Sequence, residues 1–257
     1  MAKEKQTAVV VKQEKLTEGV YSLVIKAPMA GQARPGQFVA VFPKDKSHLL
    51  GRPISICDAD PAAETLRLVY RVAGNGTAEF SALQSGNTVD VLGILGNGYD
   101  LSIFAGKKVI VIGGGIGIPP MLMTAKQFAG EKVAVLGYNG GDLFLKEEFD
   151  KECTTYVATM DGSAGTKGTV IDAIKAEGIT GDVILACGPM PMLRAVKEYA
   201  KGNGMMAFIS LEERMACGVG ACLGCVTKTT EVHHHTNVEN ARICLDGPVF
   251  NAEDVNI

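Results

Sequence analysis

Four cysteines near the C-terminus share the spacing of metal ligands, and they are Cys217, Cys222, Cys225 and Cys244. They follow the pattern C-x4-C-x2-C-x18-C and make up four of the seven cysteines in 257 residues. This is the plant-type spacing of a [2Fe-2S] site. Gly218, Gly220 and Gly224 would let the loop bend tightly and aim backbone N–H groups at the sulfurs. The pattern therefore predicts an iron–sulfur cluster.

A structural zinc site with four cysteine ligands is the main alternative. Such sites usually use two C-x2-C pairs, and this segment has only one, Cys222 and Cys225. Free thiols are a third interpretation. The histidine triplet His233–His235 could add metal ligands, but its place in the spacer before Cys244 favours a solvated loop.

The composition is that of a globular protein, with 47% hydrophobic and 21% charged residues. No apolar run is long enough to span a membrane. The net charge of -3 and the lack of a basic stripe argue against a nucleic-acid partner. The N-terminus has no apolar signal-peptide core, so we expect a cytoplasmic protein. Thiols stay reduced there, which favours metal or redox chemistry over disulfides.

Two patterns of apolar residues divide the chain. From Thr7 to about Leu101, six short alternating runs separated by turn residues predict an antiparallel β barrel. From Lys107, apolar strands alternate with helical patterns, which predicts a doubly wound parallel α/β sheet. After Leu211 neither pattern continues. This segment has little apolar material of its own, so it needs a bound metal or another cross-link to fold. The predicted domains are residues 1–101, 102–210 and 211–257.

The barrel segment "GRPISI" is a second candidate site. A fixed cation such as Arg52 suits a pyrophosphate, and a hydroxyl three residues on, Ser55, suits the polar edge of a ring. Gly76 and Thr77, in "YRVAGNGT", could let backbone amides approach the same phosphates. Taken alone, the motif also fits an ordinary edge strand.

The segment "VIVIGGGIGIPPML" predicts a buried strand, a glycine turn and a helix start, which together favour phosphate binding. Its glycines, at 113, 114, 115 and 117, depart from G-x-G-x-x-G. No acid ends the next strand, "VAVLGYNGGD", where a ribose-binding carboxylate usually stands. A tight strand-to-helix connection is the alternative.

The segment "ACGPMPML" ends a later parallel strand, at the edge where open α/β sheets bind ligands. Cys187 is either a buried core thiol or a residue of the site. Its position before Gly188 and Pro189 favours the site.

In this order, "RPIS", "GGGIGIPPM" and "CGPM" resemble the ferredoxin reductase-type flavoproteins over nearly the whole chain. The tail "MACGVGACLGC…CLDGPVF" is similar to that of the electron-transfer subunits of two-subunit, NAD-dependent dihydroorotate dehydrogenases, and it is the most specific part. Many superfamily members stack an aromatic residue on the flavin at the position of Ile54. The side chains that cover the flavin faces are therefore left open.

The resemblance implies FAD in the barrel, NAD(H) as co-substrate on the sheet and a [2Fe-2S] cluster in the tail. The implied FAD contacts are Arg52, Pro53, Ile54, Ser55, Val69, Tyr70, Arg71, Gly76 and Thr77. The implied nicotinamide contacts are Gly113, Gly114, Gly115, Gly117, Gly188 and Pro189, with Cys187 as the catalytic residue near the reactive ring. Asn139 and Gly140 stand where NADP-using relatives place basic or hydroxyl residues, so their neutrality favours NAD.

The implied role is an electron-transfer subunit in pyrimidine biosynthesis. Electrons would pass between NAD(H), FAD, the cluster and the FMN of a catalytic partner subunit, in a heterotetramer with two copies of each. No acid–base or nucleophile constellation is evident, which fits binding and orientation rather than proton chemistry. The alternatives are a diaphorase-like NADH reductase subunit of another redox enzyme and a non-catalytic redox sensor.

The tail is also the predicted docking face. From Leu211 to Ile257 it has seven acidic and three basic residues, a local net charge of -4. Leu245, Val249 and Phe250 follow the last cysteine and would be costly to expose as a patch without a partner. A merely solvated acidic tail is the alternative.

Overall fold

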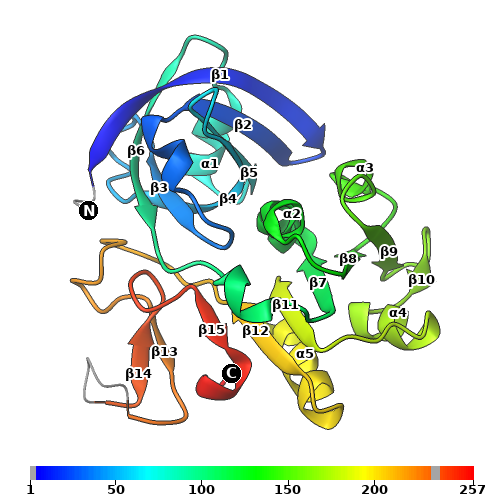
Figure 1. Ribbon diagram of the computed structural model, residues 1–257. Helices are drawn as coiled ribbons and strands as arrows, with labels where there is room; N and C mark the ends of the chain where they lie inside the picture. Colours follow the sequence, from blue (N-terminus) through cyan, green and yellow to red (C-terminus); the bar gives the residue numbers. More distant parts are fainter. Residues whose placement is uncertain (1–3, 233–237) are drawn as a thin grey trace.

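The computed structural model describes residues 4–232 and 238–257, so the histidine triplet His233–His235 lies outside the described residues. A barrel, a helix-covered sheet and a cysteine-rich tail make up the molecule, with the tail running beneath the barrel and beside the sheet (Figure 1). None of the helices in the described ranges has the length and apolar character needed to cross a membrane.

The N-terminal part is a closed six-stranded antiparallel barrel with the order β1-β2-β5-β4-β3-β6. Its strands are β1 (Lys5–Thr17), β2 (Val20–Lys26), β3 (Phe38–Phe42), β4 (Arg52–Asp60), β5 (Thr65–Arg71) and β6 (Thr88–Leu95). The predicted runs close into a barrel because alternate side chains, such as Leu66, Leu68 and Tyr70, are buried inside it. The short helices η1 (Pro28–Gln32) and α1 (Asn75–Ser81) lie in the connections.

The second part is a seven-stranded sheet with the order β10-β9-β8-β7-β11-β12-β15. The strands are β7 (Val109–Gly114), β8 (Lys132–Tyr138), β9 (Thr154–Thr159), β10 (Thr166–Lys167), β11 (Val183–Cys187), β12 (Met206–Ser210) and β15 (Val249–Asn251). All neighbours are parallel except β15, which runs antiparallel to β12. Because β15 comes from the tail, the tail completes the edge of this sheet.

Helices cover both faces of the sheet because its central strands are apolar on both sides. The helices α2 (Ile118–Gln127) and α3 (Lys146–Phe149) pack on the face that carries Val109 and Val111. The helices α4 (Val170–Ala176) and α5 (Met190–Gly202) pack on the face that carries Ile110 and Ile112. Short 3-10 turns, η2 (Leu101–Phe104) and η3 (Gly115–Gly117), flank β7. The predicted fold class, a barrel followed by a doubly wound sheet, is confirmed.

Two ion pairs join the barrel to the helices of the sheet. Lys126 Nζ on α2 lies 2.5 Å from Asp58 Oδ2 on β4, and Arg67 Nη1 on β5 lies 2.7 Å from Glu148 Oε2 on α3. Cys57 is fully buried between them, and burial raises its pKa to about 12. These contacts fix the barrel against the face of the sheet that carries α2.

The tail forms a hairpin, β13 (Val226–Lys228) and β14 (Asn240–Arg242), before β15 and the 3-10 turn η4 (Ala252–Asp254). Just after β6, the backbone N–H of Asn97 donates to the carbonyl of Gly247 at 2.6 Å, and its side-chain amide donates to the carbonyl of Leu245 at 2.8 Å. The tail therefore contacts both other parts. The domain limits at 101/102 and 210/211 stay a prediction.

The three apolar side chains predicted as a docking patch are partly buried instead. Phe250 lies opposite Ile209 where β15 pairs with β12, and it packs with Leu245 against the core. Val249 packs in the cluster between the barrel and the sheet. These side chains do not form an exposed patch, contrary to the prediction, because the chain after the last cysteine continues as a strand.

Candidate cofactor sites

The tail hairpin brings two of the four predicted metal ligands together. Cys225 stands directly before β13 and Cys244 two residues after β14, so the pairing of Val226 with Arg242 places them side by side. The backbone N–H of Cys244 donates to Cys225 Sγ at 3.4 Å. Both side chains are buried, at 2% and 0% exposed. This half of the site is supported by regular structure.

The other two cysteines lie on the glycine loop between β12 and β13. Cys217 is half-buried and Cys222 is exposed, so the site runs from the interior to the surface. Cys217 Sγ accepts hydrogen bonds from the backbone N–H groups of Val219 and Ala221, at 3.4 and 3.3 Å. Burial acts to raise the pKa of Cys217, but these N–H groups and Cys222 outweigh it and lower the pKa to about 6. Thiolates are the form that binds metals.

Gly220 shows why the loop is glycine-rich. Its φ of +86° lies in the left-handed region, and a Cβ there would stand 2.6 Å from Leu245 Cδ2. Its backbone N–H donates to Cys244 Sγ at 3.1 Å, which links the glycine loop to the distant cysteine. The sequence predicted such N–H donors, and the structure contains them.

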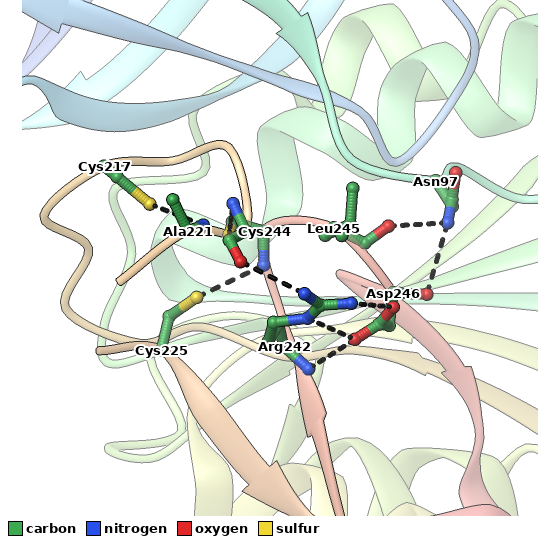
Figure 2. Close-up of polar contacts among 9 residues, drawn as sticks. Asn97, Cys217, Ala221, Cys225, Arg242, Cys244, Leu245 and Asp246 are labelled. Atoms are coloured by element: carbon green, nitrogen blue, oxygen red, sulfur yellow. Dashed lines mark hydrogen bonds and ion pairs between the residues drawn. The ribbon is translucent and has the colours of Figure 1, made fainter. Parts of the chain in front are cut away.

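An arginine holds the loop and the hairpin together (Figure 2). Arg242 Nη1 donates to the carbonyl of Gly220 at 3.1 Å, and its Nε lies 3.1 Å from Asp246 Oδ2. Asp246 also accepts from the backbone N–H of Arg242 at 2.7 Å. The side chains of Arg242 and Asp246 are only 18% and 8% exposed, so solvent screens this pair weakly. No motif in the sequence marks either residue.

The donor set fits a [2Fe-2S] cluster. Four thiols on one loop and one turn, with N–H groups directed at three of them, match the ligands and outer hydrogen bonds of such a site. Within residues 4–232 and 238–257, no three His, Cys, Asp or Glu side chains converge on one metal position. A two-iron cluster makes no such demand, because it divides its four thiolates between two irons.

A cavity of about 490 Å³ lies at the carboxyl edge of β7, β8 and β11. It is lined by the predicted nucleotide residues Gly114, Gly115, Gly117, Gly188 and Pro189, and also by Arg71, Tyr138, Asn139, Met160, Thr169, Met192 and Glu212. This is the edge where open α/β sheets bind nucleotides. The structure therefore brings most of the predicted nicotinamide contacts to one cavity.

Several glycines of the turn after β7 are required by close packing. A Cβ on Gly114 would stand 2.4 Å from Met192 Sδ, and one on Gly117 would stand 2.4 Å from the carbonyl oxygen of Cys187. Gly113 similarly lies against the Ile118 backbone. Gly115 is different: it has a φ of +53°, and the nearest atom to an added Cβ is Arg71 Nη2 at 3.6 Å. Gly115 therefore leaves room beside Arg71 for a bound group.

One end of the cavity is formed by residues from three parts of the chain. Arg71 ends β5 of the barrel, Gly188 follows β11, and Glu212 begins the tail. The surrounding walls raise the pKa of Glu212 by desolvation, while the charge of Arg71 opposes the rise. Arg71 is one of the predicted flavin contacts, whereas no motif in the sequence marks Glu212.

Cys187, the predicted catalytic residue, lies beneath this end rather than in its wall. Its side chain is 1% exposed and packs in the same cluster as Val69 and Tyr99. Burial, and then the nearby charge of Glu212, raise its pKa to about 12. The thiol is therefore protonated, which excludes a thiolate nucleophile but leaves a contact with a bound ring as a prediction.

The predicted pyrophosphate residues of the barrel lie together. The Arg52 guanidinium packs over Gly76, where an added Cβ would stand 2.7 Å from Nε. Thr77 Oγ1 accepts from the backbone N–H of Ala73 at 2.9 Å and fixes the turn before α1. Arg52 and Pro53 line a second cavity of about 410 Å³, together with Leu49, Leu50, Arg214 and Met215.

The second cavity fits a flavin nucleotide by its chemistry. Arg52 and Arg214 supply two cations for a pyrophosphate, and Leu49, Pro53 and Met215 supply apolar surface for a ring. Arg214 comes from the tail, so nothing in the sequence groups it with the barrel motif. The cavity lies between the barrel and the cysteine loop.

The remaining predicted flavin contacts divide between two faces of the strands. Tyr70 points into the barrel, where it is 2% exposed, stacks on Tyr21 and accepts a 2.8 Å hydrogen bond from Gln13 Nε2. Its neighbours Val69 and Arg71 therefore face out, because strand side chains alternate. Ile54 and Ser55 are half-buried on β4. A side-chain flavin contact stays a prediction for each of these residues.

The chain is similar in sequence to a known protein family and to several named proteins. A family described as the iron-sulfur cluster binding domain of dihydroorotate dehydrogenase B matches residues 212–256. A protein of Listeria monocytogenes named dihydroorotate dehydrogenase B (NAD(+)), electron transfer subunit, is 42% identical over 253 residues, which cover 96% of this chain and 97% of that protein. A protein of the same name from Streptococcus mutans is 42% identical and covers 96% of each chain.

A solved structure also resembles the whole chain. It belongs to an NADH-dependent reduced ferredoxin-NADP oxidoreductase studied for flavin-based electron bifurcation. It superposes with a TM-score of 0.87 and 32% identity, and covers 97% of this chain and 89% of its own.

Proposed function

The chain belongs to the family of electron transfer subunits of dihydroorotate dehydrogenase B (NAD(+)), and on this premise we propose that it passes electrons between NAD(H) and a catalytic partner that oxidises dihydroorotate. This places it in pyrimidine biosynthesis. The observation that carries the proposal is the order of sites in one chain: a nucleotide cavity, a flavin cavity on the barrel, and a four-cysteine loop whose Arg214 and Met215 line the flavin cavity.

When bound, FAD exchanges a hydride with NAD(H) and single electrons with a [2Fe-2S] cluster, so it can join the two. The residues of the chain hold and orient these groups. Arg52 and Arg214 would bind the FAD pyrophosphate, and Arg71 and Glu212 would shape the end of the nucleotide cavity next to the barrel. The four cysteines would hold the irons while Arg242 fixes the loop around them.

The partner is proposed to carry FMN and to form a heterotetramer with two copies of each chain, in the cytoplasm. The exposed side of the cysteine loop supports contact with a partner at this place. Cys222 is exposed, Leu223 is 59% exposed and Val226 is 39% exposed. Apolar side chains beside a metal ligand exclude water when they are covered, and an electron donor must approach its acceptor closely.

The test is coexpression with the FMN-containing dihydroorotate dehydrogenase subunit of the same organism. We expect a complex that elutes as one peak and reduces NAD+ with dihydroorotate, whereas the FMN subunit alone does not reduce NAD+. A chain that reduces dyes with NADH but neither binds the FMN subunit nor supports this reaction would contradict the proposal. A chain with no NADH-dependent dye reduction would support the sensor alternative.

A second candidate is a reductase subunit of another NADH-linked complex. The 32% identity and near-complete overlap with a chain of the NADH-dependent reduced ferredoxin-NADP oxidoreductase structure favour it specifically. The coexpression experiment separates the two, because this candidate predicts copurification with a different flavoprotein from the native cell. The higher identity to the dihydroorotate dehydrogenase subunits favours the first proposal.

A further inference from the structure

The flavin cavity has a wall that no motif in the sequence marks. β3 and β4 run antiparallel and pair Val41 with Arg52, and the chain between them, residues 43–51, leaves the sheet as a long loop, here called the β3–β4 loop. Hairpin connections commonly have only about two to five residues, so this loop is longer than joining the two strands requires. Its second half lines the flavin cavity, through Ser47, His48, Leu49, Leu50 and Gly51.

The tip of the loop is folded by an aspartate. Asp45 Oδ1 accepts from the backbone N–H of Ser47 at 2.8 Å, and Asp45 Oδ2 lies 3.2 Å from His48 Nδ1. The backbone N–H of His48 also donates to the Asp45 carbonyl at 3.0 Å. Leu49 and Leu50 follow, and they are 79% and 51% exposed. The loop therefore presents apolar surface to the cavity, as the rings of a flavin nucleotide require.

Two side chains from outside the loop hold its ends. Glu79, on α1, accepts from the backbone N–H of Lys44 at 2.6 Å through Oε1 and from that of Asp45 at 3.2 Å through Oε2. At the other end, Arg52 donates from Nη1 to the carbonyl of Leu50. A loop that is held at both ends keeps few conformations, so less entropy is lost when it closes on a ligand.

Both anchors meet on one face of α1. Gly76 and Glu79 are three residues apart in this helix, so they lie on the same side of it. The Arg52 guanidinium packs over Gly76, while Glu79 holds the start of the loop. The helix, the loop and the cation that is expected to bind the pyrophosphate therefore form one connected unit.

The charge of Glu79 argues against a direct contact with FAD. A carboxylate beside a pyrophosphate disfavours binding by repulsion. Both oxygens of Glu79 accept from the loop backbone instead. In the part of the chain that the structure describes, Glu79 is not one of the side chains that line this cavity. Holding the loop explains why an acid stands at this place.

We propose that Glu79 is a positioning residue for FAD: it holds the β3–β4 loop against α1, keeps Leu49 and Leu50 beside the bound flavin nucleotide, and slows its release. The inference rests on the proposed flavin cavity and does not depend on which partner receives the electrons. It also fixes the sign of the effect. Removing an acid near an anionic ligand would by charge alone tighten binding, whereas losing the anchor of the loop weakens it.

The first test measures FAD release from the purified, FAD-loaded full chain after dilution, followed by flavin fluorescence. Glu79→Ala removes both acceptors and should raise the release rate about tenfold or more, because two hydrogen bonds to a charged group are lost. Glu79→Gln keeps one acceptor oxygen and should fall between Glu79→Ala and the wild-type chain. Iron content at the wild-type level shows that a variant is folded; if Glu79→Ala loses iron, Glu79→Gln carries the comparison.

Glu18→Ala is the matched control, because Glu18 is an acid in the turn after β1 of the same barrel and its side chain is 89% exposed. This substitution removes the same charge and should leave the release rate within about twofold. Unchanged or slower release in Glu79→Ala would overturn the proposal. An equal increase in Glu18→Ala would do so as well, because the effect would then be one of overall charge.

A second test reads the loop itself, by limited trypsin digestion and mass spectrometry. Lys44 and Lys46 are exposed on the loop, so cleavage after them reports how often it opens. In Glu79→Ala these bonds should be cut about fivefold faster or more, and in the wild-type chain bound FAD should slow their cleavage. The bond after Lys151, an exposed residue just after α3, should be cut at one rate throughout. Loop cleavage that neither Glu79→Ala nor FAD changes would overturn the proposal.

If the wild-type chain holds no FAD, the proposed function fails together with this inference. If FAD is held, and the wild-type chain and Glu79→Ala release it at one rate, the positioning role fails alone.

Discussion

The nucleotide cavity and the cysteine loop are held in shape by different kinds of contact. The cavity is built on strand ends, and its shape comes from backbone contacts such as Gly117 against the carbonyl of Cys187. The loop has no regular structure of its own between Leu211 and β13, and the Arg242 side chain holds it to the hairpin. Asn97 ties the turn after β14 to the end of the barrel. The cavity should therefore tolerate single side-chain changes better than the loop does.

The largest expected effect comes from removing a cysteine ligand. Cys222→Ser should abolish the cluster, because a hydroxyl is a poor replacement for a thiolate. Iron and acid-labile sulfide should fall from about two each per chain to near zero, while NADH-to-dye reduction persists in part. Cys153→Ser, outside the loop, is the control and should keep full iron content. A wild-type chain that contains one zinc and no acid-labile sulfide would contradict the assignment of an iron–sulfur cluster.

The next effect breaks the loop without touching a ligand. Arg242→Met removes the donor to Gly220 and leaves the nearly buried Asp246 carboxylate without its cation. We expect a chain that loses iron on gel filtration and melts at a lower temperature. Lys228→Met, a cation on the same hairpin, should behave as wild type. Equal iron retention in both variants would mean that the cluster alone organises the loop.

A third effect concerns the flavin cavity between the two regions. Arg52→Ala should weaken FAD binding by roughly 1.5–3 kcal/mol, because a pyrophosphate loses a charge-assisted partner. Arg214→Ala should weaken it less, since that side chain is exposed. FAD occupancy after dialysis, read from absorbance, measures both. Full occupancy in Arg52→Ala would remove this arginine from the site.

The smallest expected effect is a difference between two thiols of the iron-free chain. With a pKa of about 6, Cys217 is mostly thiolate at pH 7 and should be alkylated by iodoacetamide within minutes. Cys187, with a pKa of about 12 and 1% exposure, stays protonated across pH 6–9 and should resist alkylation. Mass spectrometry of the alkylated peptides gives the order in which the two thiols react. Rapid labelling of Cys187 would show that the sheet edge opens.

The sequence predicted the parts of the fold that repeat a pattern. Six alternating runs became the barrel strands, and the apolar runs around Val111 and Ile184 became buried parallel strands, because period and burial are local properties. The helix α1 and the strands β13 to β15 were not predicted, since they are short and their stability comes from contacts distant in sequence. Phe250 was misplaced for the same reason.

The residues of the functional sites also divide into those that the sequence predicted and those that it did not. Motifs marked the four cysteines and the glycine turn, because each concentrates its chemistry in one stretch. Glu212 and Arg214 were missed, since each reaches its cavity from the tail and no local pattern marks it. Prediction from one sequence therefore finds the core of a site more readily than the residues that close it.

Electron transfer from NADH to the cysteine loop is tested most directly by an anaerobic titration of the purified chain with NADH, followed by visible absorbance and electron paramagnetic resonance. We expect NADH to bleach the flavin and then to produce the signal of a reduced [2Fe-2S] cluster, which takes one electron per chain, with no signal in Cys222→Ser. Flavin bleaching without a cluster signal in the wild-type chain, under conditions where dithionite does produce one, would contradict it, because electrons would not pass from the nucleotide to the cysteine loop.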